Sequence, residues 1–369
     1  MNISYVMAVF AVLGGIDYFL GNKFGIGKEF ERGIMLLGTM MLTMVGMIVL
    51  APLFAELLTP VMKLMNGTLD PSLLPALILA NDMGGAPLAL KLANNELVGV
   101  YHALIVAAMM GATISFTIPY ALGAVKEKRR EMLLGLLCGI VTIPVGAFVG
   151  GIILGIPVLV LLVNILPLAV ISGIIAFGVI KFPDACVRIF SVFGTVIKAV
   201  VVFGLVVGIV ESLTKWDIIP YTADIFEGGQ IIVTAACTMA GAFPLVGCLV
   251  LLLKKPLSAL GGKLGLKEKS VIGFLSTLAT SVITFGIIDE MDEKGAMLNS
   301  AFAVSAAWTI AGHFAFTRAF AELEGIEIPS LFPAYFAAKL IAGILAVALA
   351  AFLYRILSKR NKAQTEKSA

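Results

Sequence analysis

The chain is dominated by long apolar runs that recur along nearly its whole length, and these runs constrain its fold more than any other feature. About nine of them are long enough to cross the hydrocarbon core of a bilayer as an α-helix, which takes about 20 residues. They show no strand alternation, and backbone that faces lipid must satisfy its own hydrogen bonds, so helix is the only candidate. The runs lie at 4–21, 33–58, 97–124, 132–155, 157–181, 189–213, 229–253, 295–320 and 331–357.

The composition supports a polytopic membrane protein and excludes several other classes. Apolar residues make up 60% of the chain and charged residues 13%, which is more apolar surface than a soluble protein can cover. The net charge of +3, spread over short loops, offers no surface for nucleic acid. The cysteines lie in or beside apolar segments without CxxC spacing, so we expect no disulfide framework, metal site or cofactor at Cys138, Cys186, Cys237 and Cys248.

Two further apolar segments are interrupted by polar residues at their centres. Segment 73–93 carries Asn81 and Asp82 followed by two glycines, and segment 270–289 carries Thr280 and Ser281 in the equivalent place. Each segment could be one membrane span or a re-entrant pair of half-helices. The charges of the loops distinguish these alternatives.

Lysine and arginine collect in cytoplasmic loops of membrane proteins. The basic loops are 22–32, 125–131, 181–188 and 254–269, and all fall on the same side only if both broken segments are re-entrant. The charge run 289–294 is interpreted as a solvated loop. We therefore predict an all-α polytopic membrane protein with about nine transmembrane helices plus two broken or re-entrant hairpins, eleven hydrophobic segments in all, and a cytoplasmic C-terminus.

The order of these segments predicts an internal repeat. A shift of about 199 residues superimposes the two broken segments and also the two spans that follow each of them. The predicted topology gives the two units opposite orientations, which is the inverted-repeat organisation of many secondary transporters. The chain has no GxxxxGK[ST] loop for ATP. We divide it into a first repeat (1–155), a connector helix (156–188), a second repeat (189–357) and a cytoplasmic tail (358–369).

Asp82 is the strongest candidate for a binding residue. A carboxylate in the middle of an apolar segment costs about 2.5–3.5 kcal/mol even on lenient insertion scales, and so it needs a compensating role. The carbonyl groups that end the preceding half-helix, the Asn81 amide and the Asp82 carboxylate together suit a small cation. Gly84 and Gly85 permit close approach of a ligand to the backbone. The alternative is a loop carboxylate at the membrane surface.

Polar side chains in other apolar segments are secondary candidates, and each has a structural alternative. The amide of Asn164 either binds a substrate hydroxyl or links helices. The hydroxyls of Thr280 and Ser281 either bind substrate or satisfy their own helix. His313 either relays protons or packs as a buried imidazole. Lys339 lies deep enough in its span to be the partner of a buried carboxylate.

Several long motifs resemble the ethanolamine-utilisation permease family of the EutH type, and the resemblance extends from about residue 30 to residue 345. The motifs are ILANDMGGAPLALKLA, AAMMGATISFTIPYALG, GIVTIPVGAFVGG, VNILPL, GAFPLV and MDEKGAMLNSAFAVSAAW. The polar positions that the resemblance implies for the site are Asn81 and Asp82 through Gly85, Asn164, Asn299, Ser305 and His313. The family pattern is closer to Leu-Ala-Asn-Asn where this chain has Leu278 to Ser281, and an acidic residue often stands where this chain has Gly312.

The resemblance implies a multi-pass protein of the bacterial cytoplasmic (inner) membrane that admits ethanolamine for degradation. Its expected partners are ethanolamine and the lipid bilayer. A coupling ion, either proton or sodium, and a homo-oligomer stay open. We expect no enzyme, because no nucleophile–base pair or metal-ligand spacing is present in the sequence. The alternatives are a secondary transporter for another small amine, an amino acid or a nucleoside, and a membrane component that transports nothing.

Overall fold

A computed structural model describes residues 3–65, 69–263 and 265–368, and every regular element in these ranges is a helix. The first half contains α1 (Ile3–Phe19), α2 (Gly27–Met40), η1 (Met41–Val45), α3 (Gly46–Met65), α4 (Leu73–Ile78), η2 (Asn81–Met83), α5 (Gly85–Leu92), α6 (Glu96–Tyr101), η3 (His102–Gly111), η4 (Thr113–Thr117), α7 (Ile118–Ala124) and α8 (Arg129–Leu154). The remainder contains α9 (Val158–Lys181), α10 (Pro183–Thr214), α11 (Ile225–Lys263), α12 (Glu268–Ala279), α13 (Ser281–Gly286), η5 (Ile288–Glu290), α14 (Glu293–Ala306), α15 (Gly312–Leu323) and α16 (Leu331–Ser368).

Seven helical segments in the described part of the chain are long and apolar enough to cross a membrane. They are Gly27–Leu58, Glu96–Ala124, Arg129–Leu154, Val158–Gly178, Val192–Thr214, Ile225–Leu249 and Leu331–Lys359. The predicted first span, 4–21, corresponds to the shorter apolar helix α1. The chain is therefore a multi-pass membrane protein.

The predicted span 295–320 is not one continuous helix, and this prediction was wrong. Helix α14 ends at Ala306 and α15 begins at Gly312, with Trp308 at a φ of 55° between them. The backbone N–H groups of Trp308 and Ile310 donate to carbonyl oxygens near the end of α12, at 3.1 and 3.0 Å. Because these hydrogen bonds satisfy the broken backbone, an apolar segment can tolerate the interruption.

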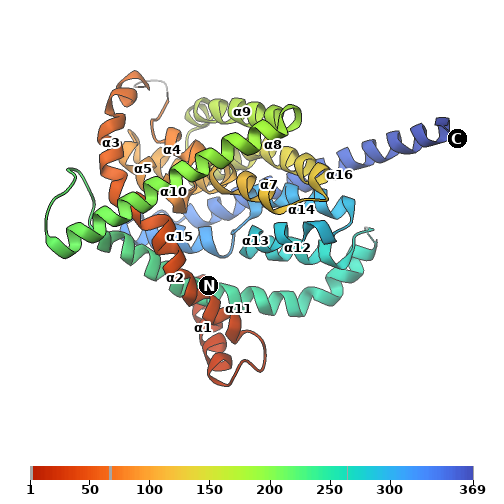
Figure 1. The fold of residues 1–369 in the computed structure, drawn as a ribbon, viewed down its shortest axis with the longest axis horizontal. Helices are drawn as coiled ribbons and strands as arrows, with labels where there is room; N and C mark the ends of the chain where they lie inside the picture. The colour runs from red at the N-terminus through yellow and green to blue at the C-terminus, as the bar shows by residue number, and fades with distance from the viewer. Residues whose placement is uncertain (1–2, 66–68, 264, 369) are drawn as a thin grey trace.

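The first broken segment folds back on itself as a hairpin formed by α4 and α5, drawn in orange in Figure 1. Asp70 stands at its base, just before α4. The Asp70 carboxylate accepts hydrogen bonds from the backbone N–H groups of Ser72 at 3.0 Å, Asn94 at 3.1 Å and Asn95 at 3.0 Å. Since Asn94 and Asn95 follow α5, these bonds hold the two ends of the segment together.

The second broken segment forms another hairpin, from α12, α13 and η5, drawn in cyan in Figure 1. Asp292 stands just beyond its second arm. Its Oδ1 accepts from the backbone N–H of Lys267 at 2.8 Å and from the hydroxyl of Ser270 at 2.6 Å, where the first arm begins. One aspartate therefore closes the base of each hairpin. The charge run 289–294, interpreted from sequence as a solvated loop, contains this half-buried structural carboxylate.

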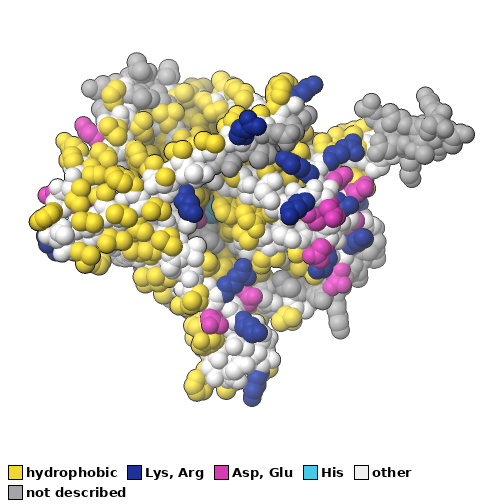
Figure 2. Space-filling view, in the orientation of Figure 1, with side chains coloured by type: hydrophobic (Ala, Val, Ile, Leu, Met, Phe, Trp, Pro, Cys, Tyr) yellow, Lys and Arg dark blue, Asp and Glu magenta, His cyan; other side chains and the backbone are white. Residues whose placement is uncertain are grey.

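The helices pack so that the two halves of the chain interlock. Helix α8 packs on α16 and on α14, α1 packs on α11, and α10 packs on α3. In the view of Figure 1, α9 lies along the upper edge and α11 along the lower edge. Apolar side chains cover much of the face around α10 in Figure 2, as expected for a surface in contact with lipid. The span Glu96–Ala124 lies instead in the interior, and 94% of its most apolar stretch is buried.

Candidate functional site

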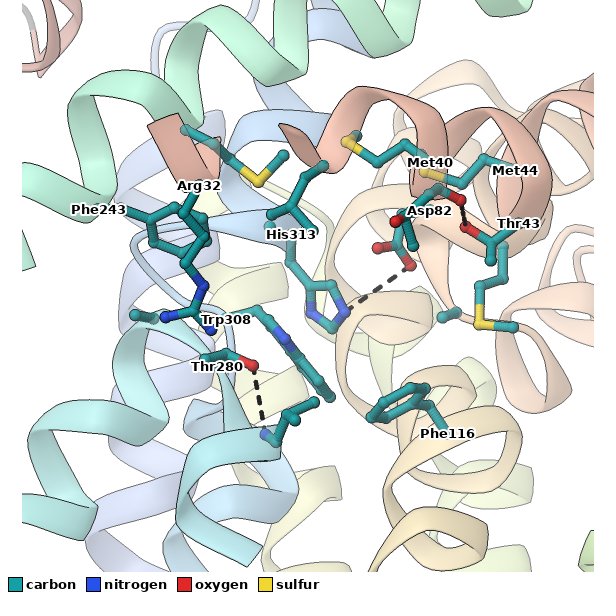
Figure 3. Close-up of a pocket in the computed structure, with 18 residues that line it drawn as sticks. Arg32, Met40, Thr43, Met44, Asp82, Phe116, Phe243, Thr280, Trp308 and His313 are labelled. Atoms are coloured by element: carbon teal, nitrogen blue, oxygen red, sulfur yellow. Dashed lines mark hydrogen bonds and ion pairs between the residues drawn. The ribbon is translucent and has the colours of Figure 1, made fainter. Parts of the chain in front are cut away.

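A cavity of about 400 Å³ lies where the tips of the two hairpins approach the break between α14 and α15. The first hairpin contributes Asp82, the second contributes Thr280, and the break contributes Trp308 and His313. Side chains of α2, η1, η4 and α11 complete the wall. Figure 3 shows Asp82 and His313 directed toward each other across the cavity. Three side chains singled out from the sequence, Asp82, Thr280 and His313, thus meet in one place.

Asp82 is the first member of a chain of polar groups that leads from the cavity into the interior. Its Oδ1 lies 3.9 Å from Nε2 of His313, and Nδ1 of the same imidazole lies 3.3 Å from Nζ of Lys339. Lys339 donates to the carbonyl oxygen of Ala108 at 2.7 Å. The Asp82 side chain is 25% exposed, whereas Lys339 is only 1% exposed. The carboxylate is therefore the part of the chain that a ligand can reach.

Aromatic rings form much of the wall near this carboxylate. The Trp308 ring lies 4.8 Å from the His313 imidazole and 5.0 Å from the Phe116 ring, measured between ring centroids. At the other side of the cavity the Arg32 guanidinium lies 5.1 Å from the centroid of Phe243 (Figure 3). Aromatic faces attract cations through the ring quadrupole. A carboxylate beside such faces is suited to an alkylammonium group.

Thr280 supplies a hydroxyl at the opposite hairpin tip. It caps the N-terminus of α13, and its Oγ1 accepts a hydrogen bond from the backbone N–H of Val282 at 3.2 Å. Serine and threonine favour this position because the side-chain oxygen satisfies an unpaired helix N–H. The hydroxyl proton is not used in that bond, so it can be donated to an oxygen atom in the cavity.

Comparison with known proteins places the chain in a family. The sequence model of the family described as "Ethanolamine utilisation protein, EutH" matches residues 1–353. The chain belongs to this family. The resemblance inferred from the sequence motifs is thereby confirmed.

Three relatives of the EutH-family chain match over nearly the whole of both sequences. "Probable ethanolamine permease EutH" of Listeria monocytogenes is 39% identical, covering 99% of this chain and 96% of the relative. A protein of the same name from Escherichia coli is 34% identical, with coverages of 96% and 92%. "Uncharacterized protein YxeR" of Bacillus subtilis is 33% identical, with coverages of 95% and 94%. No solved structure gives a significant match.

Three other predicted site residues of this EutH-family protein lie at the first hairpin tip and do not line the cavity. Gly84 has a φ of 95°, and a Cβ atom there would overlap the side chain of Met47. A Cβ atom at Gly85 would overlap the carbonyl oxygen of Leu79. Asn81 is fully buried and donates to the hydroxyl of Thr317 at 3.3 Å. Gly84 and Gly85 therefore permit the tight turn of the backbone at the tip of the first hairpin.

The remaining predicted residues also lie outside the cavity lining. Asn164 donates to the Val160 carbonyl at 2.9 Å, and its Oδ1 accepts from the backbone N–H of Asp70 at 3.4 Å. Asn299 donates to the carbonyl oxygens of Ser270 and Gly295 at 2.8 and 2.9 Å, which ties α14 to α12. Ser281 and Ser305 are fully buried and also line no part of the cavity.

Several cavity residues carry no signal in the sequence that sets them apart. Phe116, Phe243 and Trp308 are ordinary members of apolar segments, so no pattern distinguishes them. Arg32 was assigned from the sequence to the basic loop 22–32, but it lies in α2, where it pairs with Glu29 at 3.5 Å and reaches the cavity wall. These residues become visible only when the fold brings distant segments together.

One close serine–histidine pair also escaped the sequence analysis. The Ser72 hydroxyl lies 2.7 Å from Nδ1 of His102 and donates to Oδ1 of Asp70 at 2.6 Å. Ser72 and His102 are both fully buried at the base of the first hairpin, and neither lines the cavity. This network therefore braces the hairpin base, and no substrate can reach it in this conformation.

None of the described cysteine side chains lines the cavity. Cys138, Cys237 and Cys248 are free thiols, and the side chain of Cys186 lies outside the described residues. Among the described residues, no group of three or more histidine, cysteine, aspartate or glutamate side chains is placed to hold a metal ion.

Proposed function

We propose that this protein is a permease that admits protonated ethanolamine into the bacterial cytoplasm for catabolism. The observation that carries the proposal is the Asp82 carboxylate in an aromatic-walled cavity between the two hairpin tips of a EutH-family chain. Two of the relatives described above are named as probable ethanolamine permeases. Their names and the chemistry of the cavity indicate the same ligand.

The two ends of ethanolamine match the two hairpin tips. Its ammonium group pairs with Asp82 and faces the rings of Trp308 and Phe116, while its hydroxyl accepts from or donates to Thr280. A site that must pair both ends of a ligand discriminates against analogues that lack one of them, because its own buried polar groups would be left unpaired. We assign direct ligand contact to Asp82, Thr280 and His313, and a supporting role to the other candidate residues.

We further propose the finer architecture: nine membrane spans, two re-entrant hairpins and two inverted repeats, with the hairpins at the substrate site. The nine spans include the short helix α1 and count α14 and α15 together as one broken span. The hairpin bases closed by Asp70 and Asp292 support re-entry. The repeat is supported by the matching element order and by reciprocal packing, since α1 contacts α11 and α10 contacts α3. Rocking of one repeat against the other would expose the cavity alternately to the two sides.

Cysteine labelling tests this topology in a background without the native cysteines. A cysteine replacing the exposed Glu324 should react with a membrane-impermeant maleimide added outside intact cells. A cysteine replacing Lys128 should react only after the membrane is permeabilised. Labelling of both positions from outside would contradict the proposed arrangement of spans.

Uptake of labelled ethanolamine into proteoliposomes tests the function itself. The assay is run as counterflow against preloaded unlabelled ethanolamine, at mildly acidic pH where the uncharged amine that crosses lipid is scarce. We expect saturable uptake that unlabelled ethanolamine inhibits and alanine or uridine does not. Inhibition by alanine or uridine would favour an amino-acid or nucleoside carrier, and flux equal to that of empty liposomes would refute a permease.

A further inference from the structure

Lys339 is a buried cation that the proposed binding site does not itself require. It lies in the third turn of α16 and is 1% exposed. Its Nζ contacts the Ala108 carbonyl at 2.7 Å and His313 Nδ1 at 3.3 Å, and it lies 5.7 Å from the centroid of the Tyr335 ring. None of the described carboxylates lies within ion-pair distance of it. An ammonium group buried in this way is costly, so its retention calls for a function.

His313 connects this lysine to the carboxylate of the cavity. One nitrogen of the imidazole faces Lys339 and the other faces Asp82, at 3.3 and 3.9 Å. With Asp82 ionised and Lys339 protonated, the charges of these two groups cancel, and the Arg32 guanidinium at the cavity wall is paired with Glu29 at 3.5 Å. An arriving ethanolammonium pairs with Asp82 and leaves Lys339 as an uncompensated buried charge. Loss of one proton from Lys339 restores neutrality.

We propose that Lys339 is the coupling residue of the permease, which exchanges one proton for each ethanolammonium that binds at Asp82. The proposal rests on the proposed function. On substrate binding, the Lys339 ammonium gives a proton to Nδ1 of His313, and the proton on Nε2 leaves to water in the cavity. After the substrate is released on the other side, Nε2 takes a proton from water and Nδ1 returns one to Lys339. Each cycle moves one cation inward and one proton outward, with no net charge transferred.

The surroundings of Lys339 leave few other groups to take its proton. The charged or titratable groups that face it are Asp82 from the first hairpin, His313 from α15 and Tyr335 one turn earlier on α16. The elements packed against α16 are α8, α14 and η3, together with α15, whose Phe314 ring contacts Phe332 and Phe336. Besides His313, the ionisable residues of α15 are Arg318 and Glu322, which pair with each other at 3.6 Å. Apart from the Cys138 thiol, α8 and α14 carry their ionisable residues in their first turns (Arg129, Arg130, Glu131, Glu293 and Lys294), and in η3 the ring of His102 contacts Ser72.

The experiment measures uptake and charge movement together in proteoliposomes that contain a pH-sensitive dye. Membrane potential is set with potassium gradients and valinomycin. For the wild type we expect one internal proton to leave for each labelled ethanolamine that the protein takes up. In empty liposomes we expect no proton movement beyond that caused by the slow leak of the uncharged amine. The initial rate should be the same with and without an inside-negative potential.

Two substitutions separate coupling from binding. Lys339→Met removes the proton donor, so any uptake that remains should become faster at inside-negative potential and lose its proton movement. Lys339→Arg keeps a charge that cannot be released, so we expect it to lose uptake under all conditions while retaining the fold. Lys198→Met, at an exposed position on α10, is the matched control and should behave as wild type.

The outcomes distinguish failure of the coupling proposal from failure of the proposed function. Wild-type uptake that is saturable but driven by membrane potential, without outward proton flow, would overturn the role of Lys339 and leave the permease intact. Electroneutral uptake that persists in the Lys339→Arg variant would overturn it as well. Absence of saturable counterflow in the wild type would instead refute the proposed function.

Discussion

The two hairpins occupy equivalent positions in the order of the chain, but they carry different chemistry at their tips. Both are closed at the base by one aspartate, Asp70 in the first and Asp292 in the second. At the tip, the first presents the Asp82 carboxylate and the second presents the Thr280 hydroxyl. The shared frame and the different tips indicate that each half of the molecule recognises a different end of one small ligand.

The helices that follow the hairpins differ in a related way. After the first hairpin the chain continues without interruption through Glu96–Ala124, although η3 and η4 are wound as π-helices, which often mark functional sites. After the second hairpin the corresponding stretch breaks between α14 and α15. The π-helical stretch provides the Ala108 carbonyl for Lys339, and the break provides His313. The asymmetry thus provides the middle of the polar chain, at His313, and its inner end, at the Ala108 carbonyl.

The largest effect on ligand binding is expected from removing the charge at the first hairpin tip. In the Asp82→Asn variant, unlabelled ethanolamine and ethylamine should each inhibit the uptake of labelled ethanolamine about 10- to 100-fold less strongly than in the wild type. The reason is that a hydrogen bond to a charged group contributes about 1.5–3 kcal/mol. Glu322→Gln makes the same change at a side chain that is 65% exposed and should have no effect. A variant that retains wild-type affinity for either amine would remove Asp82 from the site.

A glycine substitution compares the backbone of the two hairpins. Gly84→Ala should lower the stability of the purified protein by about 2–4 kcal/mol, since it combines a left-handed residue with overlap on Met47. Gly286→Ala, in the second hairpin where no atom lies within 4 Å of an added Cβ, should leave stability unchanged or slightly increased. Thermal unfolding in detergent measures both. Equal melting temperatures would contradict the account of the first tip.

The hydroxyl of the second hairpin should affect only ligands that carry a hydroxyl. Thr280→Val should weaken competition by ethanolamine about 3- to 10-fold, the equivalent of about 0.5–1.5 kcal/mol for a neutral hydrogen bond, and leave ethylamine unchanged. Thr280→Ser is the matched control that keeps the hydroxyl. An equal loss of affinity for ethanolamine and ethylamine in the Thr280→Val variant would mean that the residue supports the fold and does not contact the substrate hydroxyl.

The smallest effect concerns the acid stability of the second hairpin base. Partial burial raises the pKa of Asp292, but hydrogen bonds from the Ser270 hydroxyl and the backbone N–H groups of Lys267 and Gly295 outweigh it, so the pKa is lowered from its ordinary value of 3.8. This carboxylate therefore contributes stability above about that value, and the contribution is lost as the pH falls through the lowered pKa. The Asp292→Asn variant should have a lower melting temperature than the wild type near neutral pH. The difference between the two melting temperatures should become smaller as the pH is lowered. A constant difference across pH would contradict the assignment.

His313 was a candidate both from the sequence and from the family resemblance, and the fold brings it to the same cavity as Asp82 and Thr280. The amino-acid sequence was sufficient to predict the helical membrane class and the two segments that are interrupted at Asp82 and Thr280. These features depend on polar residues at the centre of apolar runs, where their cost makes them conspicuous. The break between α14 and α15 could not be predicted in this way, because residues 307–311 are mostly apolar and their backbone is satisfied by a distant helix. Asp70 and Asp292 were equally hidden, since a carboxylate that accepts backbone N–H groups from another segment resembles any loop charge.

Direct binding of labelled ethanolamine to the purified protein tests the central claim, that the Asp82 carboxylate between the hairpin tips holds the ammonium group. Equilibrium binding avoids the passive leak of the uncharged amine that affects uptake. The account predicts saturable binding to the wild type, displaced by unlabelled ethanolamine, and its loss in an Asp82→Asn variant that melts at the wild-type temperature. Equal binding to the two folded proteins would contradict it.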